Sequence, residues 1–357
     1  MGSEKIYMCS TYHHVLISVI KTLINNECEN DILICQDIPE HKHIMNKLDE
    51  TGLFKNVFFL DRDKIVSYKS KTLFGKIFIE HRKNKKRVEK VFKIDLKRYE
   101  SVNIFHDGTK LGEYLQDKKI KYHLIEDGLN HFQDIEKTPS QKLLVEKGTI
   151  KYFLKKYLGV GYLACGQNKY CQSIEVNENK NLKITHKKII EVSKESMFKK
   201  LTDEQKKIVL SIFIKNDEIF NIDKNSVLIL TIPLYNDNYV DKIAYQIEIY
   251  RDIIEKYLQK GYKVLVKPHP RDYLEYKKLF ENVIILDKNL PIEVLNLNDA
   301  VKFTEAVAIN SSSIKLLKNV NNKIELPFEY LNNYYNYLTN WSKERLRSLK
   351  TQDKMVV

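Results

Sequence analysis

Short apolar runs recur along the first 125 residues, and several are followed by a polar turn and a segment with helical spacing. The runs that predict strands are residues 6–9, 32–35, 57–60, 102–106 and 122–125. Apolar residues return at helical spacing between Val15 and Leu23, and further helical segments are predicted at 42–51 and 110–116. Strands that alternate with helices in this way form a parallel sheet with helices on its faces.

The same alternation begins again near residue 223. Apolar runs predict strands at 227–232, 264–266, 283–286 and 306–309, and Gly261 follows a predicted helix at 239–258. Another helix is predicted to begin at Ile314. We therefore predict an α/β fold with two Rossmann-like, doubly wound domains at 1–222 and 223–330, followed by a helical segment at 331–357. The lysine-rich stretch 142–221 stays unassigned, apart from a helix at 203–214.

The chain has 357 residues and a formal charge of +13, which favours polyanions, acidic membrane surfaces or anionic small molecules as partners. The run from Lys76 to Arg98 is strongly basic. It is either a solvated helix face or a surface that contacts anionic lipid, where each basic residue adds about 1 kcal/mol. Nucleic acid is not expected, because no aromatic stacking pattern accompanies the charge.

The five cysteines show no CxxC spacing, which indicates neither a zinc site nor a disulfide framework and points to a reducing compartment. Cys9 and Cys35 lie in apolar runs and are predicted to be small core residues. No apolar signal region begins the chain, and no stretch of about 18 apolar residues could cross a membrane. We expect a cytoplasmic protein, with peripheral contact at the inner face of the plasma membrane left open.

Two polar motifs follow predicted strands. Glu126, Asp127 and Gly128 end the strand at 122–125, and the glycine lets the backbone turn sharply and bring the acids close to a ligand. An ordinary acidic turn is the alternative. In the second half, His269 lies between Pro268 and Pro270, which stiffen it on both sides.

Positive charge surrounds this histidine, because Lys267 and Arg271 flank it. An imidazole and two cations at a strand end suit a phosphate, although a solvated histidine in a proline-rich turn has the same pattern. Ser311, Ser312 and Ser313 follow the strand at 306–309. They either cap a helix or offer hydroxyl and N–H groups to a phosphate.

The two predicted domains would create a cleft between their strand ends, with a carboxylate opposite a phosphate site. That layout suits transfer of a group from an activated phospho-donor to a hydroxyl that the carboxylate deprotonates. No Asp-x-Asp motif or metal-ligand spacing is present, so His269, Lys267 or Arg271 and the serines would neutralise the leaving phosphate. The sequence also lacks a Walker loop and a GxGxxG turn, which argues against P-loop kinases and dinucleotide enzymes.

In this order, the acidic-acidic-Gly, His-Pro and serine-rich motifs resemble those of bacterial GT-B sialyltransferases. The contexts Leu230-Thr231-Ile232-Pro233-Leu234, Lys267-Pro268-His269-Pro270 and Leu326-Pro327-Phe328-Glu329 are most similar to the lipooligosaccharide and capsule sialyltransferases of glycosyltransferase family 52 and relatives. The polysialyltransferases share the three motifs. The resemblance covers about residues 120–330, and the first hundred residues match only as a generic domain.

The resemblance implies a metal-free, inverting transfer of sialic acid from CMP-sialic acid to a glycan that ends in galactose or sialic acid. No cofactor is implied. Glu126 would be the general base, with Asp127 as its orienting neighbour or substitute, and Gly128 would complete the motif. His269, with Pro270 and Lys267 around it, would bind the CMP phosphate and donate a proton to it. The serines Ser311, Ser312 and Ser313 would contact the same phosphate.

The loop from Ser10 to His14 follows the first predicted strand and would line the acceptor side, although His13 and His14 also suit a plain surface. Two other functions remain open. One is a different GT-B transferase with a CDP-polyol or nucleotide-sugar donor. The other is a non-catalytic protein that binds anionic glycans or lipids, which the basic charge supports.

Overall fold

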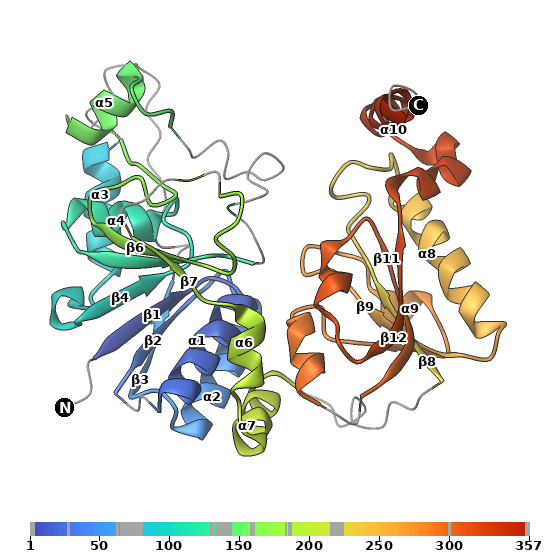
Figure 1. The fold of residues 1–357 in the computed structure, drawn as a ribbon, viewed down its shortest axis with the longest axis horizontal. Coiled ribbons are helices and arrows are strands. Elements are labelled where there is room, and N and C mark those ends of the chain that lie inside the picture. The colour runs from blue at the N-terminus through green and yellow to red at the C-terminus, as the bar shows by residue number, and fades with distance from the viewer. Residues whose placement is uncertain are drawn as a thin grey trace. The chain divides into compact units, whose positions relative to one another are not determined.

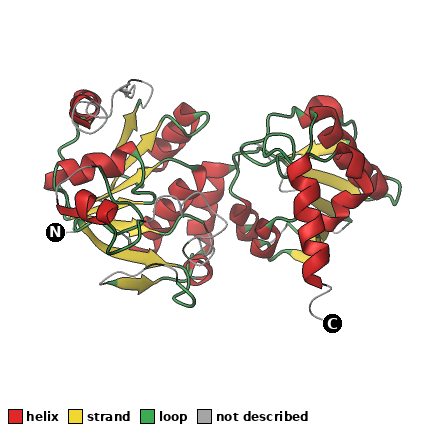
Figure 2. Ribbon diagram, turned by 90° about the horizontal axis from the view of Figure 1, so that it is seen from above, coloured by secondary structure: helices red, strands yellow, loops and turns green. Residues whose placement is uncertain are grey.

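A computed structural model describes residues 4–26, 29–61, 64, 81–128, 132, 145–157, 161–182, 184, 188–214, 225–298 and 301–353. The chain divides into two compact units, unit 1 at Met1–Ile212 and unit 2 at Phe213–Val357. Each unit is a parallel sheet with helices on both faces (Figures 1 and 2). Unit 1 ends ten residues before the predicted boundary at 222. The predicted basic run is described only from residue 81 onward.

Unit 1 contains a seven-stranded sheet in the order β3-β2-β1-β4-β5-β6-β7, and every neighbouring pair is parallel. Its strands are β1 (Lys5–Cys9), β2 (Asp31–Cys35), β3 (Asn56–Leu60), β4 (Ser101–Ile104), β5 (Tyr122–Ile125), β6 (Cys171–Val176) and β7 (Ile189–Glu191). The first five were predicted from their apolar runs. The last two were not, because β6 alternates apolar residues with Gln172, Ser173 and Glu175.

The helices of unit 1 cover both faces of this sheet. Helices α1, α2 and α6 lie on one face, while α3 and α4 pack together on the other (Figure 1). The helices are α1 (Tyr12–Asn25), α2 (His41–Thr51), α3 (His81–Val91), the 3-10 helix η2 (Leu96–Arg98), α4 (Lys110–Asp117), α5 (Ile150–Tyr157), α6 (Lys194–Lys199) and α7 (Asp203–Phe213).

Helix α1 begins directly at the end of β1. The Thr11 side chain caps it by accepting a hydrogen bond from the His14 N–H, 3.2 Å away. Val15, Leu16, Val19 and Ile20 repeat at helical spacing and are fully buried. The helix is therefore held against the sheet, and of the segment Ser10–His14, which was predicted as a loop, only Ser10 and Thr11 precede the helix at the carboxyl edge of β1.

Unit 2 contains a five-stranded parallel sheet in the order β10-β9-β8-β11-β12. Its strands are β8 (Ser226–Leu230), β9 (Lys263–Lys267), β10 (Val283–Ile285), β11 (Phe303–Ile309) and β12 (Val320–Leu326). Its helices are α8 (Ile243–Leu258), α9 (Tyr276–Leu279), α10 (Asn340–Asp353) and the 3-10 helices η6 (Ile292–Leu297), η7 (Ser312–Leu316) and η8 (Phe328–Tyr337).

The prediction of a helix from Ile314 was wrong. Ser312 and Ser313 belong to the short 3-10 helix η7, and the chain then continues as the strand β12. This strand pairs with β11 at the edge of the sheet, where Asn321, Asn322 and Lys323 are exposed. Because three consecutive residues of β12 are polar, its sequence lacks the alternation of apolar and polar residues that predicts a strand.

The segment after residue 330 belongs to unit 2. Its residues Leu331, Leu338 and Leu346 are buried in the same core cluster as β8 and β9. The Val240–Leu338 bridge adds an antiparallel backbone pair. The predicted helical segment is therefore part of the second core.

Two further predictions can be compared with the described residues. The four cysteines among them, Cys9, Cys35, Cys165 and Cys171, are buried, so Cys9 and Cys35 are core residues as predicted. In the part of the chain that the structure describes, no helix is long and apolar enough to span a bilayer.

Candidate active site

In unit 1 the candidate site residues lie at the carboxyl ends of three adjacent strands, β1, β4 and β5. The sheet order places β4 between β1 and β5, so the loops that follow these strands meet at one edge. The strand order changes direction between β1 and β4, and ligands of doubly wound sheets bind at such switch points. The acidic motif follows β5, and the segment Ser10–His14, which includes the first turn of α1, follows β1.

The two acids of the motif have different surroundings. Glu126 is 1% exposed, and its carboxylate accepts hydrogen bonds from the backbone N–H groups of Phe132 (3.0 Å) and Asn177 (2.7 Å). The Asp127 side chain is 34% exposed, and its Oδ1 lies 3.1 Å from His14 Nε2. Both oxygens of Glu126 are thus occupied by protein groups, while Asp127 is accessible to a ligand.

A lysine that was not predicted from the sequence holds the backbone of the acidic motif. Lys194, at the first position of α6, donates from Nζ to the carbonyl oxygens of Glu126 (3.1 Å) and Gly128. Its Nζ also lies 3.4 Å from His13 Nε2. Gly128 adopts a φ of +76°, which favours glycine and confirms why the motif ends in this residue. Lys194 is 66 residues away in sequence, so no local pattern links it to the motif.

His14 is buried, so the surface interpretation is wrong for this residue. Its ring stacks on Phe105 with centroids 4.3 Å apart and planes 5° apart. The Ser10 N–H donates to His14 Nδ1 at 3.1 Å. Burial lowers the pKa of His14, and this effect exceeds the opposing influence of Asp127.

In unit 2 the His-Pro motif forms a tight turn after β9. The Asp272 N–H donates to the His269 carbonyl at 2.9 Å, and Pro270 occupies the second position of this turn, where proline fits best. The His269 N–H donates to Thr231 Oγ1 at 3.2 Å, and the Arg271 N–H donates to His269 Nδ1 at 3.1 Å. The histidine ring is therefore fixed by its own turn.

The protonation of His269 follows from this geometry. Burial, together with the positive charges of Arg271 and Lys267, lowers the pKa of His269 to about 4. The ring is neutral at neutral pH. Since Nδ1 accepts a hydrogen bond, the ring proton lies on Nε2, which is a donor for a ligand.

Both flanking cations have protein partners. Lys267 is buried and donates from Nζ to the carbonyl oxygens of Pro268 (2.9 Å) and Lys288 (2.8 Å), and burial lowers its pKa to about 8. Arg271 forms a bidentate ion pair with Asp237 at 2.7 and 2.9 Å. Lys267 thus fixes the backbone of the motif, and Arg271 is held by a carboxylate.

A buried network of hydrogen bonds around Asp272 stabilises the turn that contains His269. Asp272 is 1% exposed and accepts hydrogen bonds from Gln246 Nε2 (2.9 Å) and the Tyr276 hydroxyl (2.8 Å). Thr231 Oγ1 lies 3.4 Å from the same carboxylate and accepts from the His269 N–H. Thr231 lies within a context that the sequence singled out, but its partners were not predictable from it.

The serine motif lies at the same edge of the unit 2 sheet as His269. Strand β8 separates β9 from β11, so the two motifs are two strands apart, about 10 Å. Ser311 has an extended backbone and makes no side-chain capping bond, while the Ser312 side chain lies outside the described residues. Ser312 and Ser313 are the first two residues of η7. The capping role predicted as an alternative is therefore absent at Ser311.

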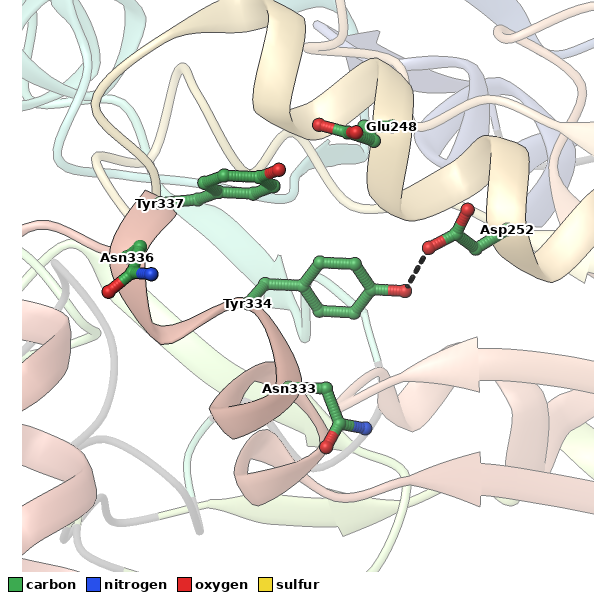
Figure 3. A pocket seen from close by; sticks show the side chains of 6 residues that line it. All are labelled: Glu248, Asp252, Asn333, Tyr334, Asn336 and Tyr337. Carbon is green, nitrogen blue, oxygen red and sulfur yellow. Dashed lines mark hydrogen bonds between the residues drawn. The ribbon is translucent and has the colours of Figure 1, made fainter.

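A pocket in unit 2 contains none of the predicted site residues (Figure 3). It measures about 220 Å³ and lies between α8 and η8. Two carboxylates, two amides and two tyrosines line it: Glu248, Asp252, Asn333, Asn336, Tyr334 and Tyr337. The Tyr334 hydroxyl donates a hydrogen bond to Asp252 at 2.6 Å. Among the described residues, no group of three or more His, Cys, Asp or Glu side chains could hold a metal ion.

Three solved structures with a similar fold are two sialyltransferases and a sugar-nucleotide epimerase. An α/β-galactoside α-2,3-sialyltransferase of Photobacterium phosphoreum gives a TM-score of 0.53 at 14% identity, with 90% of each chain covered. The GT-B domain of a Photobacterium damselae sialyltransferase gives 0.52 at 14% identity, again with 90% of each chain covered. A UDP-GlcNAc 2-epimerase of Methanocaldococcus jannaschii gives 0.50 at 14% identity, covering 98% and 99%. These similarities show that the fold is GT-B, as the motifs predicted.

Sequence comparison identifies the family. An uncharacterized protein of Haemophilus influenzae is 29% identical over 199 residues, which are 55% of this chain and 59% of that relative's length. The profile of the alpha-2,8-polysialyltransferase (POLYST) family matches residues 5–326, which include all three motifs. The chain thus has the GT-B fold and belongs to the alpha-2,8-polysialyltransferase family.

Proposed function

We propose that the protein is an inverting sialyltransferase that moves sialic acid from CMP-sialic acid to a glycan hydroxyl and requires neither metal nor cofactor. The observation that carries the proposal is the fixed, neutral His269, whose Nε2–H is a donor at the strand ends of unit 2. The family match includes this residue and the accessible carboxylate of Asp127. The CMP donor follows from the motif resemblance.

In this reaction the acceptor hydroxyl attacks the anomeric carbon of sialic acid as the bond to the CMP phosphate oxygen breaks. Asp127 takes the hydroxyl proton, and the bonding electrons leave with CMP. His269 Nε2–H stabilises the charge that develops on the phosphate, with Ser311, Ser312 and Ser313 as further donors. Attack on the face opposite CMP inverts the anomeric configuration.

We assign the base to Asp127 and a structural role to Glu126. A general base needs an oxygen within reach of the hydroxyl proton. The two backbone N–H groups of Phe132 and Asn177 already occupy the Glu126 carboxylate, which is almost fully buried. Asp127 is one-third exposed and lies at the end of the same strand.

The acceptor in this proposal is a glycan that ends in sialic acid or galactose, within a capsule polysaccharide or a lipooligosaccharide. The family description favours a sialic acid terminus and repeated transfer. The Photobacterium phosphoreum structure concerns a galactoside acceptor of that protein. A panel of sialosides and galactosides with CMP-sialic acid, analysed by product mass and linkage, separates these acceptors.

Nucleotide binding tests the donor. CMP should raise the melting temperature more than UDP or CDP at the same concentration, and transfer should persist in EDTA. Selective stabilisation by CDP or UDP would favour another GT-B transferase. No stabilisation by any nucleotide and no transfer would favour a protein that only binds anionic glycans or lipids.

We also propose that the basic run contacts anionic membrane. In the described part, Lys83, Lys86 and Lys90 are exposed on α3, while Arg98 pairs with Asp31 at 2.7 Å. Exposed lysines on one helix suit phosphatidylglycerol headgroups. Co-sedimentation with anionic vesicles should exceed that with phosphatidylcholine vesicles and should fall in a triple Lys→Gln variant. Equal binding by wild type and variant would remove this contact.

A further inference from the structure

We propose that His14 is a positioning residue for the reaction, which orients Asp127 through its Nε2–H and supports the carboxylate as the base. The proposal rests on the proposed function for the role of Asp127. It concerns a residue that comes from a different strand end than the acidic motif. The family match and the motif resemblance assign it no role.

The His14 ring has one orientation. It lies flat on Phe105, which follows β4, the strand between β1 and β5. Phe105 therefore lies between the ends of β1 and β5 and supports one face of the imidazole ring. The Ser10 N–H donates to Nδ1 from the other side of the ring.

This orientation determines the tautomer. Since Nδ1 accepts a hydrogen bond, the neutral ring carries its proton on Nε2. His14 Nε2 lies 3.1 Å from Asp127 Oδ1 but is poorly aligned with it, so this buried donor forms no good hydrogen bond to any described residue. Catalytic hydrogen bonds often tighten only when the substrate is bound.

Burial keeps the His14 ring neutral against the opposing charge of Asp127. Asp127 raises its pKa, whereas His13 and Lys194 lower it, and burial has the largest effect, so the pKa of His14 is below its ordinary value. A neutral donor can hold Asp127 in place without neutralising it as a counter-charge would. The geometry resembles a base whose orientation is set by a third group.

Two His14 substitutions separate the donor from the ring. His14→Phe keeps an aromatic ring that can stack on Phe105 but has no Nε2–H. His14→Gln loses the stack but keeps an amide donor at a similar reach. His41→Phe is the matched control, because His41 also stacks on a phenylalanine, Phe59, at 4.5 Å and 18°, away from the acidic motif.

We expect His14→Phe to lower kcat for transfer about 10- to 100-fold, the effect of one hydrogen bond to a charged group. Its KM for CMP-sialic acid should change less than about threefold, because the phosphate contacts are in unit 2. The acidic limb of its pH–rate profile should move to higher pH, since the carboxylate loses a donor. His14→Gln should recover most of kcat, and His41→Phe should match the wild type.

A folded His14→Phe protein with wild-type kcat and an unshifted acidic limb would overturn the proposal. Equal losses in both His14 variants with an unshifted limb would show a packing role only. NMR of ¹⁵N-histidine tests the geometry without any donor, even if His14→Phe fails to fold. The His14 signal should show the neutral Nε2–H tautomer at pH 6.5 and should change in Asp127→Asn. The Nδ1–H tautomer or a cation would contradict the inference.

These experiments also separate the inference from the proposed function. A wild-type protein that does not use CMP-sialic acid fails the proposed function, while the NMR result still decides the contact of His14 with Asp127. A wild-type protein that transfers sialic acid, together with an unaffected His14→Phe variant, fails the inference alone.

Discussion

Substitution of the two neighbouring acids should produce opposite results. Glu126→Gln keeps one carbonyl oxygen for the N–H of Phe132 or Asn177 but turns an NH₂ group toward the other, at a site that is 1% exposed. One hydrogen bond to a charged group contributes about 1.5–3 kcal/mol, and a buried unsatisfied N–H costs about 1–3 kcal/mol. Because these effects overlap, we expect a loss of about 2–4 kcal/mol in the free energy of unfolding.

In a unit of this size, such a loss lowers the melting temperature by about 4–16 °C. Asp127→Asn should change it by less than about 2 °C, because the Asp127 side chain is one-third exposed and the substitution keeps its size and shape. The same variant should lower kcat about 10²- to 10⁴-fold, the usual contribution of a general base. Glu126→Gln, measured well below its melting temperature, should keep kcat within about tenfold.

Differential scanning fluorimetry gives the stability, and CMP release with a sialoside acceptor gives kcat. Glu113→Gln is a suitable control, because it removes a carboxylate whose ion pair with Lys110 is local and partly exposed. A Glu126→Gln protein that melts like the wild type but is inactive would refute this reasoning. It would return the base to Glu126, as the sequence alone suggested.

Further expectations concern unit 2. His269→Ala should lower kcat/KM for CMP-sialic acid at least about 100-fold while the fold persists, as circular dichroism can verify. Thr231→Val removes the acceptor of the His269 N–H and should raise the donor KM about 2- to 13-fold, the value of one neutral hydrogen bond. Lys267→Met leaves two carbonyl oxygens without their donor and should lower the melting temperature. Since the folded-state pKa of His269 is about 4, below the ordinary 6.5, the unfolded chain binds more protons between these values, so stability should fall as pH drops from 6.5 to 4. His269→Gln should flatten that decline in urea unfolding measured across this range.

The sequence predicted the parts of the fold that carry a continuous apolar signal. Strands β1, β2, β8 and β9 are buried on both faces, and their runs are unmistakable. Strands β6 and β12 carry polar side chains at intervals and were missed. Helix α8 begins four residues after the predicted start at 239, because Val240 pairs with Leu338 in an antiparallel bridge and Lys242 is extended.

The sequence predicted which motifs form the candidate site, but it did not predict the role of each residue within them. Nothing local distinguishes Glu126 from Asp127, because the N–H of Asn177 that binds the glutamate comes from 51 residues away. Lys194 and His14 reach the acidic motif from the first turns of α6 and α1. Such partners depend on the order of strands in the sheet, which one sequence does not specify.

The low pKa of His269 has a consequence for the end of each catalytic cycle. In the proposed reaction the phosphodiester group of CMP-sialic acid has one negative charge, whereas the phosphate of released CMP is a monoester that gains a second. In this proposal the added charge next to His269 raises the pKa of its ring from the low value in the free protein, so the ring binds a proton more readily while CMP is bound. CMP should therefore be a stronger competitive inhibitor at pH 6 than at pH 8. An enzyme that adds many sugars to one chain would clear its product fastest on the alkaline side of neutrality.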